Sequence, residues 1–175
     1  MRILKPPKKS DILALRCRKF LNSSFTSPPG YFLLVINSYG HRVEVSETGH
    51  DVVKRSDLLY LLKKNFEITW GTENNLPYFS DGRILPDKLL GVNGTASFEV
   101  SAPVDLFRRL EMYNFRKISI NRFKNIWRPH WNNLLREAIM EKGVNYIDVP
   151  LLIPTLKHTI YGVKTLQINY KGSNQ

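Results

Sequence analysis

The residues best suited to chemistry in this sequence are cations between positions 108 and 124. An arginine can donate two hydrogen bonds to O6 and N7 of guanine, and lysine and arginine side chains bind phosphate groups. Six cations occur in this stretch, interrupted by the single acidic residue Glu111. The residues that we expect to contact DNA are Arg108, Arg109, Met112, Asn114, Arg116, Lys117, Arg122 and Lys124.

A helix over residues 103–114 is predicted to position the first of these cations. Ser101-Ala102-Pro103 is typical of a helix start, because proline is tolerated in the first turn. One face of this helix would hold Leu106, Phe107, Leu110 and Tyr113, and another would hold Asp105, Arg108, Arg109 and Met112. The first face can pack on a core while the second meets DNA. The alternative is an ordinary solvated face, in which Asp105 and Arg109 pair at i, i+4.

The apolar pattern predicts the elements around this helix. Further helices are expected over 11–22, over 57–66 with Ser56 as N-cap, in a short segment ending at Gly91, and from Asn132 or Asn133 to Gly143. Strands are expected at 31–36, 41–45, 67–70, 76–79, 95–100, 115–120, 125–131 and 165–170. Turns are expected at Tyr39-Gly40, at Asn74-Asn75 and from residue 81.

From residue 51 the predicted order is helix, two strands, helix, helix and two strands, which is the chain order of a winged helix-turn-helix. We therefore expect an α+β fold with a three-helix core and a small antiparallel sheet, plus strand-containing extensions at both ends. The expected domains are a basic N-terminal arm with a β-hairpin (1–50), the winged-helix DNA-binding domain (51–142) and a C-terminal extension with a strand (143–175).

Composition limits the class of protein. The chain has 175 residues and a formal net charge of +11, which favours a polyanionic partner such as nucleic acid. Cys17 is the only cysteine and the four histidines lack metal-ligand spacing, so we expect no metal and no cofactor. No apolar stretch is long enough for a membrane-spanning helix. The sequence contains no nucleophile elbow, phosphate-binding loop or clustered carboxylates, so we do not expect an enzyme.

The segment DLFRRLEMYNFRKI resembles the signature of the heat shock transcription factor family. Leu110, Tyr113, Phe115 and Lys117 match the family, and Arg108 stands where the family has its base-reading arginine. The resemblance covers about residues 51–142. It implies a nuclear transcription regulator that inserts helix 104–113 into the major groove of double-stranded DNA containing GAA, with Arg108 reading a base.

The segment also departs from the family pattern. Asp105 and Glu111 replace a serine and an asparagine, and they motivate the alternative of a winged-helix protein-interaction module that has lost specific DNA binding. Pro150 and Pro154 interrupt the region after the domain, so no coiled coil for trimerisation is expected there. A protein partner or a homodimer would have to use another surface.

Overall fold

The computed structural model describes residues 2–18, 23–36, 43–46 and 57–174. Strands hold 48% of these residues and helices hold 26%. The structure contains large antiparallel sheets and no three-helix core among its described residues, so the winged helix-turn-helix prediction is wrong. Three of the predicted helices are strands, and one predicted strand lies inside a long helix.

The elements follow one another along the chain in this order. The N-terminal strands are β1 (Arg2–Ile3), β2 (Ile12–Cys17), β3 (Phe25–Thr26), β4 (Tyr31–Ile36), β5 (Val43–Ser46) and β6 (Leu58–Lys63). They are followed by β7 (Asn65–Gly71), β8 (Leu76–Ser80), β9 (Arg83–Val100), α1 (Pro103–Arg109), the 3₁₀ helix η1 (Met112–Asn114) and β10 (Lys117–Ser119). The remaining elements are α2 (Ile120–Lys142), α3 (Val149–Leu152), η2 (Ile153–Thr155), β11 (Thr159–Ile160) and β12 (Val163–Asn174).

The chain forms two compact units, each assembled from separate stretches of sequence. Unit 1 comprises residues 1–66, 99–122 and 160–163, and unit 2 comprises residues 67–98, 123–159 and 164–175. The division predicted from the sequence follows the chain, with boundaries after residues 50 and 142. The boundary at 50 lies outside the described residues, and residue 142 is the last residue of α2.

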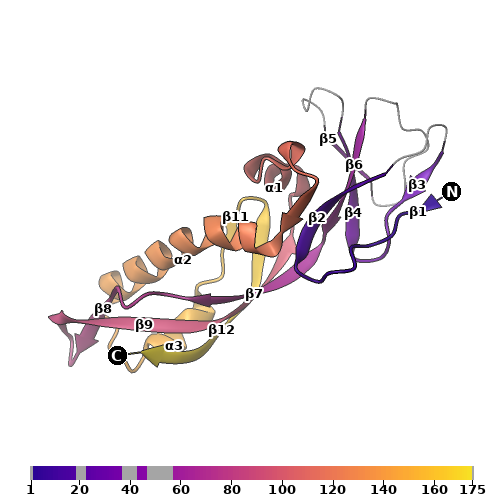
Figure 1. Ribbon diagram of the computed structural model, residues 1–175. Helices are drawn as coiled ribbons and strands as arrows, with labels where there is room; N and C mark the ends of the chain where they lie inside the picture. Colours follow the sequence, from indigo (N-terminus) through magenta and orange to yellow (C-terminus); the bar gives the residue numbers. More distant parts are fainter. Residues whose placement is uncertain (1, 19–22, 37–42, 47–56, 175) are drawn as a thin grey trace. The chain divides into compact units, whose positions relative to one another are not determined.

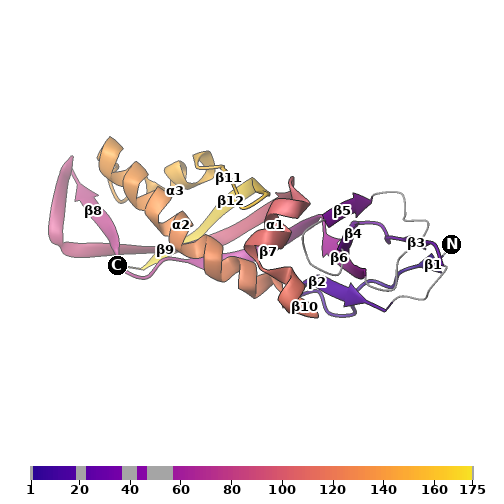
Figure 2. The same cartoon turned by 90° about the horizontal axis from the view of Figure 1, so that it is seen from above.

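Unit 1 is built on an antiparallel sheet with the strand order β10-β2-β6-β4-β5 (Figures 1 and 2; β10 is labelled in Figure 2). On one face, Leu33 and Leu61 pack in a cluster with Leu4 and Phe25 from the N-terminal region, where β1 and β3 pair in parallel. On the other face, the Tyr60 ring meets Phe107 of α1 edge-on, with ring centroids 5.7 Å apart. Both faces of the sheet are therefore covered.

Burial on both faces explains why the helix predicted over 57–66 is wrong. Leu59, Tyr60, Leu61 and Leu62 in β6 are all 0% exposed. A strand that is buried on both sides needs a continuous apolar run, and such a run also satisfies helical spacing. The helix predicted over 11–22 is wrong for the same reason, because β2 begins with three buried residues. The predicted cap at Ser56 and turn at Tyr39-Gly40 lie outside the described residues.

Several strand predictions are confirmed. β4, β7 and β8 coincide with the predicted strands at 31–36, 67–70 and 76–79, and β5 is the antiparallel partner of β4. The predicted strands at 95–100 and 165–170 lie inside β9 and β12, and β10 forms the centre of the one predicted at 115–120. The turn after β8 is also confirmed: Asp81 and Gly82 both have positive φ, as a two-residue β-hairpin turn requires.

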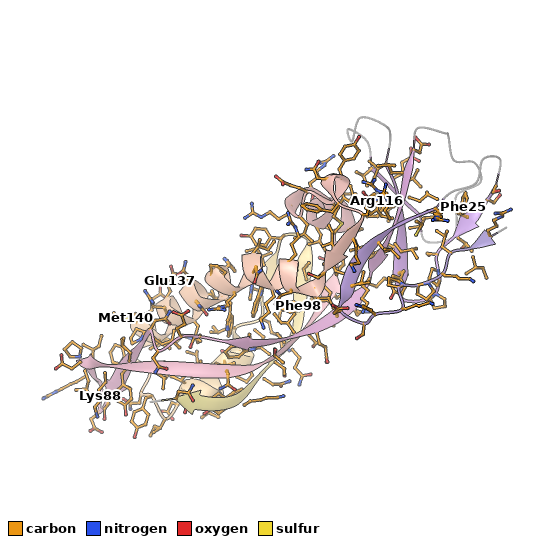
Figure 3. All side chains as sticks on the ribbon, in the orientation of Figure 1. Phe25, Lys88, Phe98, Arg116, Glu137 and Met140 are labelled. Carbon is orange, nitrogen blue, oxygen red and sulfur yellow. The ribbon has the colours of Figure 1, made fainter. Side chains whose placement is uncertain are left out.

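Unit 2 is a sheet with one long helix packed across it. β12, β9 and β7 are neighbours in this sheet, β8 pairs with β9, and α2 runs along one face (Figures 1 and 2). The buried residues of α2 recur at helical spacing: Phe123, Trp127, Trp131, Leu135, Ala138 and Ile139. Figure 3 shows Phe98 of β9 on the side that faces this helix; its ring lies 5.3 Å from that of Trp127, centroid to centroid.

Two predictions fail in unit 2 because long-range packing overrides local signals. The strand predicted over 125–131 is wrong, since Trp127 and Trp131 lie one turn apart on α2 and Pro129 stands inside the helix. The helix predicted to end at Gly91 is also wrong, because β9 runs through this segment and pairs with β8. The predicted end of the last helix is confirmed, since α2 ends at Lys142 and Gly143 has a φ of +57°.

A partly buried histidine stacks on the aromatic core of unit 2. The ring of His158 stacks with those of Trp127 and Trp131, at centroid distances of 6.1 and 6.2 Å. Burial lowers the pKa of His158 below its ordinary value, and nearby His130 adds to this effect, while the contact with the Leu156 carbonyl opposes it. The neutral imidazole is therefore the form that fits this core.

The stability of unit 2 is expected to fall as the pH drops below about 6.5, the ordinary pKa of histidine. Below that pH the unfolded chain binds a proton at His158 that the folded unit resists, so protonation favours unfolding. All three tryptophans belong to unit 2, so urea titrations followed by tryptophan fluorescence at pH 7.5 and 5.5 report on this unit. Between pH 7.5 and 5.5 the His158→Phe variant should lose less stability than the unmodified protein. An equal loss of stability would contradict the assignment of the pH effect to His158.

Candidate functional site

The surplus of positive charge is concentrated in unit 1. By sequence, unit 1 contains 17 Lys and Arg residues against 8 Asp and Glu residues, whereas unit 2 contains 9 against 7. Unit 1 thus carries +9 of the net charge of +11. A polyanion attracted by this protein would meet its strongest field at unit 1.

The predicted DNA-contacting residues lie mainly in one segment of unit 1, residues 103–119, which we call the cationic segment. It comprises α1, η1 and β10. The helix predicted over 103–114 is shorter than expected, because α1 ends at Arg109 and Glu111 adopts a left-handed backbone with φ of +51°. The prediction of a helix starting at Pro103 is confirmed.

Tyr60 holds the cationic segment against the sheet. Its hydroxyl donates toward the carbonyl oxygens of Phe115 at 2.8 Å and Met112 at 3.1 Å, and it accepts a hydrogen bond from Arg16 Nε at 2.8 Å. Burial raises the pKa of Tyr60, with the guanidinium of Arg16 opposing that shift, so the hydroxyl keeps its proton at neutral pH. The turn that carries the cations is therefore fixed by a buried donor.

Arg16 reinforces the same anchoring from β2. Its Nη2 donates to the Tyr113 carbonyl at 2.9 Å, and its backbone N–H donates to the Arg116 carbonyl at 2.8 Å. Figure 3 shows Arg116 where the chain approaches β2. Sequence reasoning missed Arg16, because only the pairing of β10 with β2 brings it beside a segment that follows it by about a hundred residues.

The cationic segment presents most of its cations to solvent. The exposed members of the predicted set are Arg108, Arg109, Asn114, Arg116 and Lys117. Arg108, Arg116 and Lys117 form no ion pair within the described part of the chain. Arg109 lies over the Tyr161 ring, with Cζ 4.3 Å from the centroid, and does not pair with Asp105.

The other three predicted residues are placed differently. Met112 is 0% exposed and belongs to the core of unit 1, so its expected contact with DNA is incompatible with its burial. Arg122 is partly buried; its Nε donates to the Leu110 carbonyl at 3.2 Å and its guanidinium lies over the Phe115 ring. Lys124 belongs to unit 2. The structure thus gathers five exposed residues of the predicted set in the cationic segment.

The described residues offer little for metal or thiol chemistry. They contain no cluster of His, Cys, Asp and Glu that could hold a metal ion. Burial raises the pKa of Cys17 to about 11, so its thiol stays protonated and poorly nucleophilic at neutral pH. No helix in the described ranges is sufficiently long and apolar to cross a membrane.

No family model matches the sequence, and no curated protein matches it. The resemblance to heat shock factors therefore stays a prediction from the sequence, while the winged-helix fold that it implied is contradicted by the observed sheets.

Proposed function

We propose that this protein binds nucleic acid, with the cationic segment of unit 1 contacting the phosphate backbone. The observation that carries this proposal is the set of exposed cations, Arg108, Arg109, Arg116 and Lys117, on a segment anchored by Tyr60 and Arg16. Within the described ranges these exposed cations have no acidic partner, so they can neutralise phosphates. Their fixed backbone reduces the ordering cost of binding.

The geometry favours phosphate contacts over base reading. α1 has seven residues, which corresponds to a length of about 10 Å. Its exposed arginines lie in its last turn, and the remaining cations come from the irregular chain and from β10. Phosphate contacts of this kind give affinity and position without sequence information. Double-stranded DNA is the partner expected from the sequence, and the same contacts suit the backbone of any nucleic acid.

A salt titration tests the proposal directly. We expect a fluorescently labelled duplex of random sequence to bind with an affinity that falls steeply with salt. Four phosphate contacts would lower the affinity roughly a hundredfold between 50 and 200 mM salt, because each lysine or arginine that binds a phosphate releases counterions from the nucleic acid. Fluorescence anisotropy measures the binding of the duplex, and of a single strand of the same length, over a series of salt concentrations. It gives the slope of log affinity against log salt for each of the two. Absence of binding, or binding insensitive to salt, would refute the proposal and favour the alternative of a protein-interaction module.

A further inference from the structure

A polar groove of about 470 Å³ lies within unit 2. None of the residues that line it belongs to the cationic segment. One face of α2 and the turn between β7 and β8 form its walls. The residues that line the groove are Glu73, Asn75, Asn125, Arg128, Pro129, Asn132, Asn133 and Arg136. Its volume is in the range of sites that hold small organic ligands.

The helix contributes only guanidinium, carboxamide and proline side chains to this groove. Asn125, Arg128, Asn132 and Arg136 are spaced by three or four residues, so they follow one another along a single helix face. The acidic residue in the lining is Glu73, which comes from the turn. A ligand with negative charge is therefore favoured on the helix side.

The two arginines have spare hydrogen-bond donors. Arg128 contacts Glu73 through a single pair of atoms 3.3 Å apart, and the side chains are 43% and 79% exposed. Arg136 donates from Nη2 to the Asn75 carbonyl at 3.0 Å. A guanidinium has five N–H donors, so both residues can still bind a phosphate group. An exposed pair such as Arg128 and Glu73 contributes little to stability and is readily exchanged for a ligand.

Two asparagine side chains that line the groove each have an acceptor without a donor within the described ranges. The Oδ1 atoms of Asn75 and Asn132 are buried and have no hydrogen-bond partner within the described ranges. Pro129 has no N–H, so it cannot make the helical hydrogen bond to the carbonyl of Asn125. Buried polar atoms such as the two Oδ1 atoms are normally satisfied, and a ligand with N–H or O–H donors can satisfy either one once its carboxamide turns toward the groove.

We propose that this groove binds a phosphorylated ligand of nucleotide size. Arg128 and Arg136 hold the phosphate, and the Asn75 and Asn132 oxygens accept hydrogen bonds from an amino group of the base or from sugar hydroxyls. Inorganic phosphate offers no amino group or sugar hydroxyl to the carboxamides, and an uncharged nucleoside would leave the arginines unused. The ligand is either a free nucleotide or one nucleotide of a nucleic acid strand.

Isothermal titration calorimetry of the full chain tests this proposal with four probes: adenosine 5′-monophosphate, adenosine, inorganic phosphate and a single-stranded adenine decamer. We expect at least tenfold weaker binding of adenosine and of phosphate than of the nucleotide or the decamer. If the nucleotide and the decamer bind with comparable affinity, the ligand is a free nucleotide. If only the decamer gives a heat of binding, the ligand is a nucleic acid strand. No binding of either, or equal binding of phosphate and nucleotide, overturns the proposal.

Variants then assign the binding to the groove. Arg128→Gln and Arg136→Gln should each weaken binding of the better probe at least tenfold, and Glu73→Gln should tighten it because a competing carboxylate is removed. Arg83→Gln is the matched control, since Arg83 is an exposed arginine of unit 2 that does not line the groove. Thermal unfolding followed by tryptophan fluorescence shows that each variant is folded. If Arg128→Gln and Arg136→Gln bind as tightly as Arg83→Gln, the proposal is wrong.

If the decamer is the better probe, the cationic segment can bind it as well. The titration is then repeated in a background that lacks the cations at 108, 109, 116 and 117. Binding that persists in this background and is lost with Arg136→Gln supports the groove site independently of unit 1. Loss of all decamer binding in the background alone refutes the groove site and leaves the function proposed for unit 1 in place.

Discussion

Replacing Gly94 with alanine is expected to destabilise unit 2 by about 1–3 kcal/mol, the usual cost of forcing extra volume into a packed site. Gly94 lies in β9, where a Cβ atom would overlap the carbonyl oxygen of Asn169 in β12. It would also come within 2.8 Å of Cζ2 of Trp70. The clash is with backbone of a neighbouring strand, so rotation of a side chain cannot relieve it.

Urea unfolding followed by tryptophan fluorescence measures this effect, because Trp70, Trp127 and Trp131 all lie in unit 2. Gly71→Ala is the matched control. Gly71 lies in β7 of the same sheet, and its added Cβ would have its nearest neighbour at 3.6 Å, an ordinary contact distance. Both substitutions reduce the freedom of the unfolded chain similarly. Equal midpoints for the two variants would show that β9 and β12 do not approach as closely as described.

Replacing Arg108, Arg109, Arg116 and Lys117 together with glutamine is expected to weaken binding to a duplex by about a hundredfold or more at low salt. Each exposed cation neutralises one phosphate, and each loss should lower the slope of log affinity against log salt by about one. Fluorescence anisotropy over a salt series measures affinity and slope together. The four side chains are exposed, so the fold of unit 1 should be unaffected.

A control with the same change of net charge is available in unit 2. Lys142, Lys157, Lys164 and Lys171 are exposed, and replacing all four with glutamine removes the same charge from the molecule. We expect this control to retain most of the affinity. Similar losses in both variants would mean that total charge, and not the cationic segment, determines binding.

Arg108→Ala alone separates phosphate contact from base reading. The resemblance to heat shock factors implies a larger loss on a duplex containing GAA than on a scrambled one. The structure removes the fold on which that reading rested, so we expect equal losses on the two duplexes. A selective loss on the GAA duplex would restore the base-reading role of Arg108.

Local features of the sequence determined several parts of this protein. The start of α1 at Pro103, the hairpin turn at Asp81-Gly82 and the end of α2 before Gly143 depend on backbone preferences of single residues, which act at short range. Strands such as β4 and β7 followed from their apolar and alternating patterns. The basic charge and the exposed cations near Arg108 were also evident without coordinates.

Only the tertiary structure decided the identity of the segments whose burial depends on distant partners. β6 is a strand because the N-terminal strands cover one of its faces and α1 the other, and a doubly buried strand has no alternation to reveal it. α2 passes through Pro129 because Trp127 and Trp131 pack on the sheet of unit 2, where Trp70 meets Trp131 at 5.2 Å between centroids.

The site shows the same division between sequence and tertiary structure. The sequence determined which cations are present, since composition and exposed charge need no partner. The fold decided that Met112 is buried, that Lys124 lies in the other unit and that Arg16 anchors the segment. It also brought Glu73 and Asn75 beside the arginines of α2. Contacts between residues far apart in the chain arise from packing, and no local pattern encodes them.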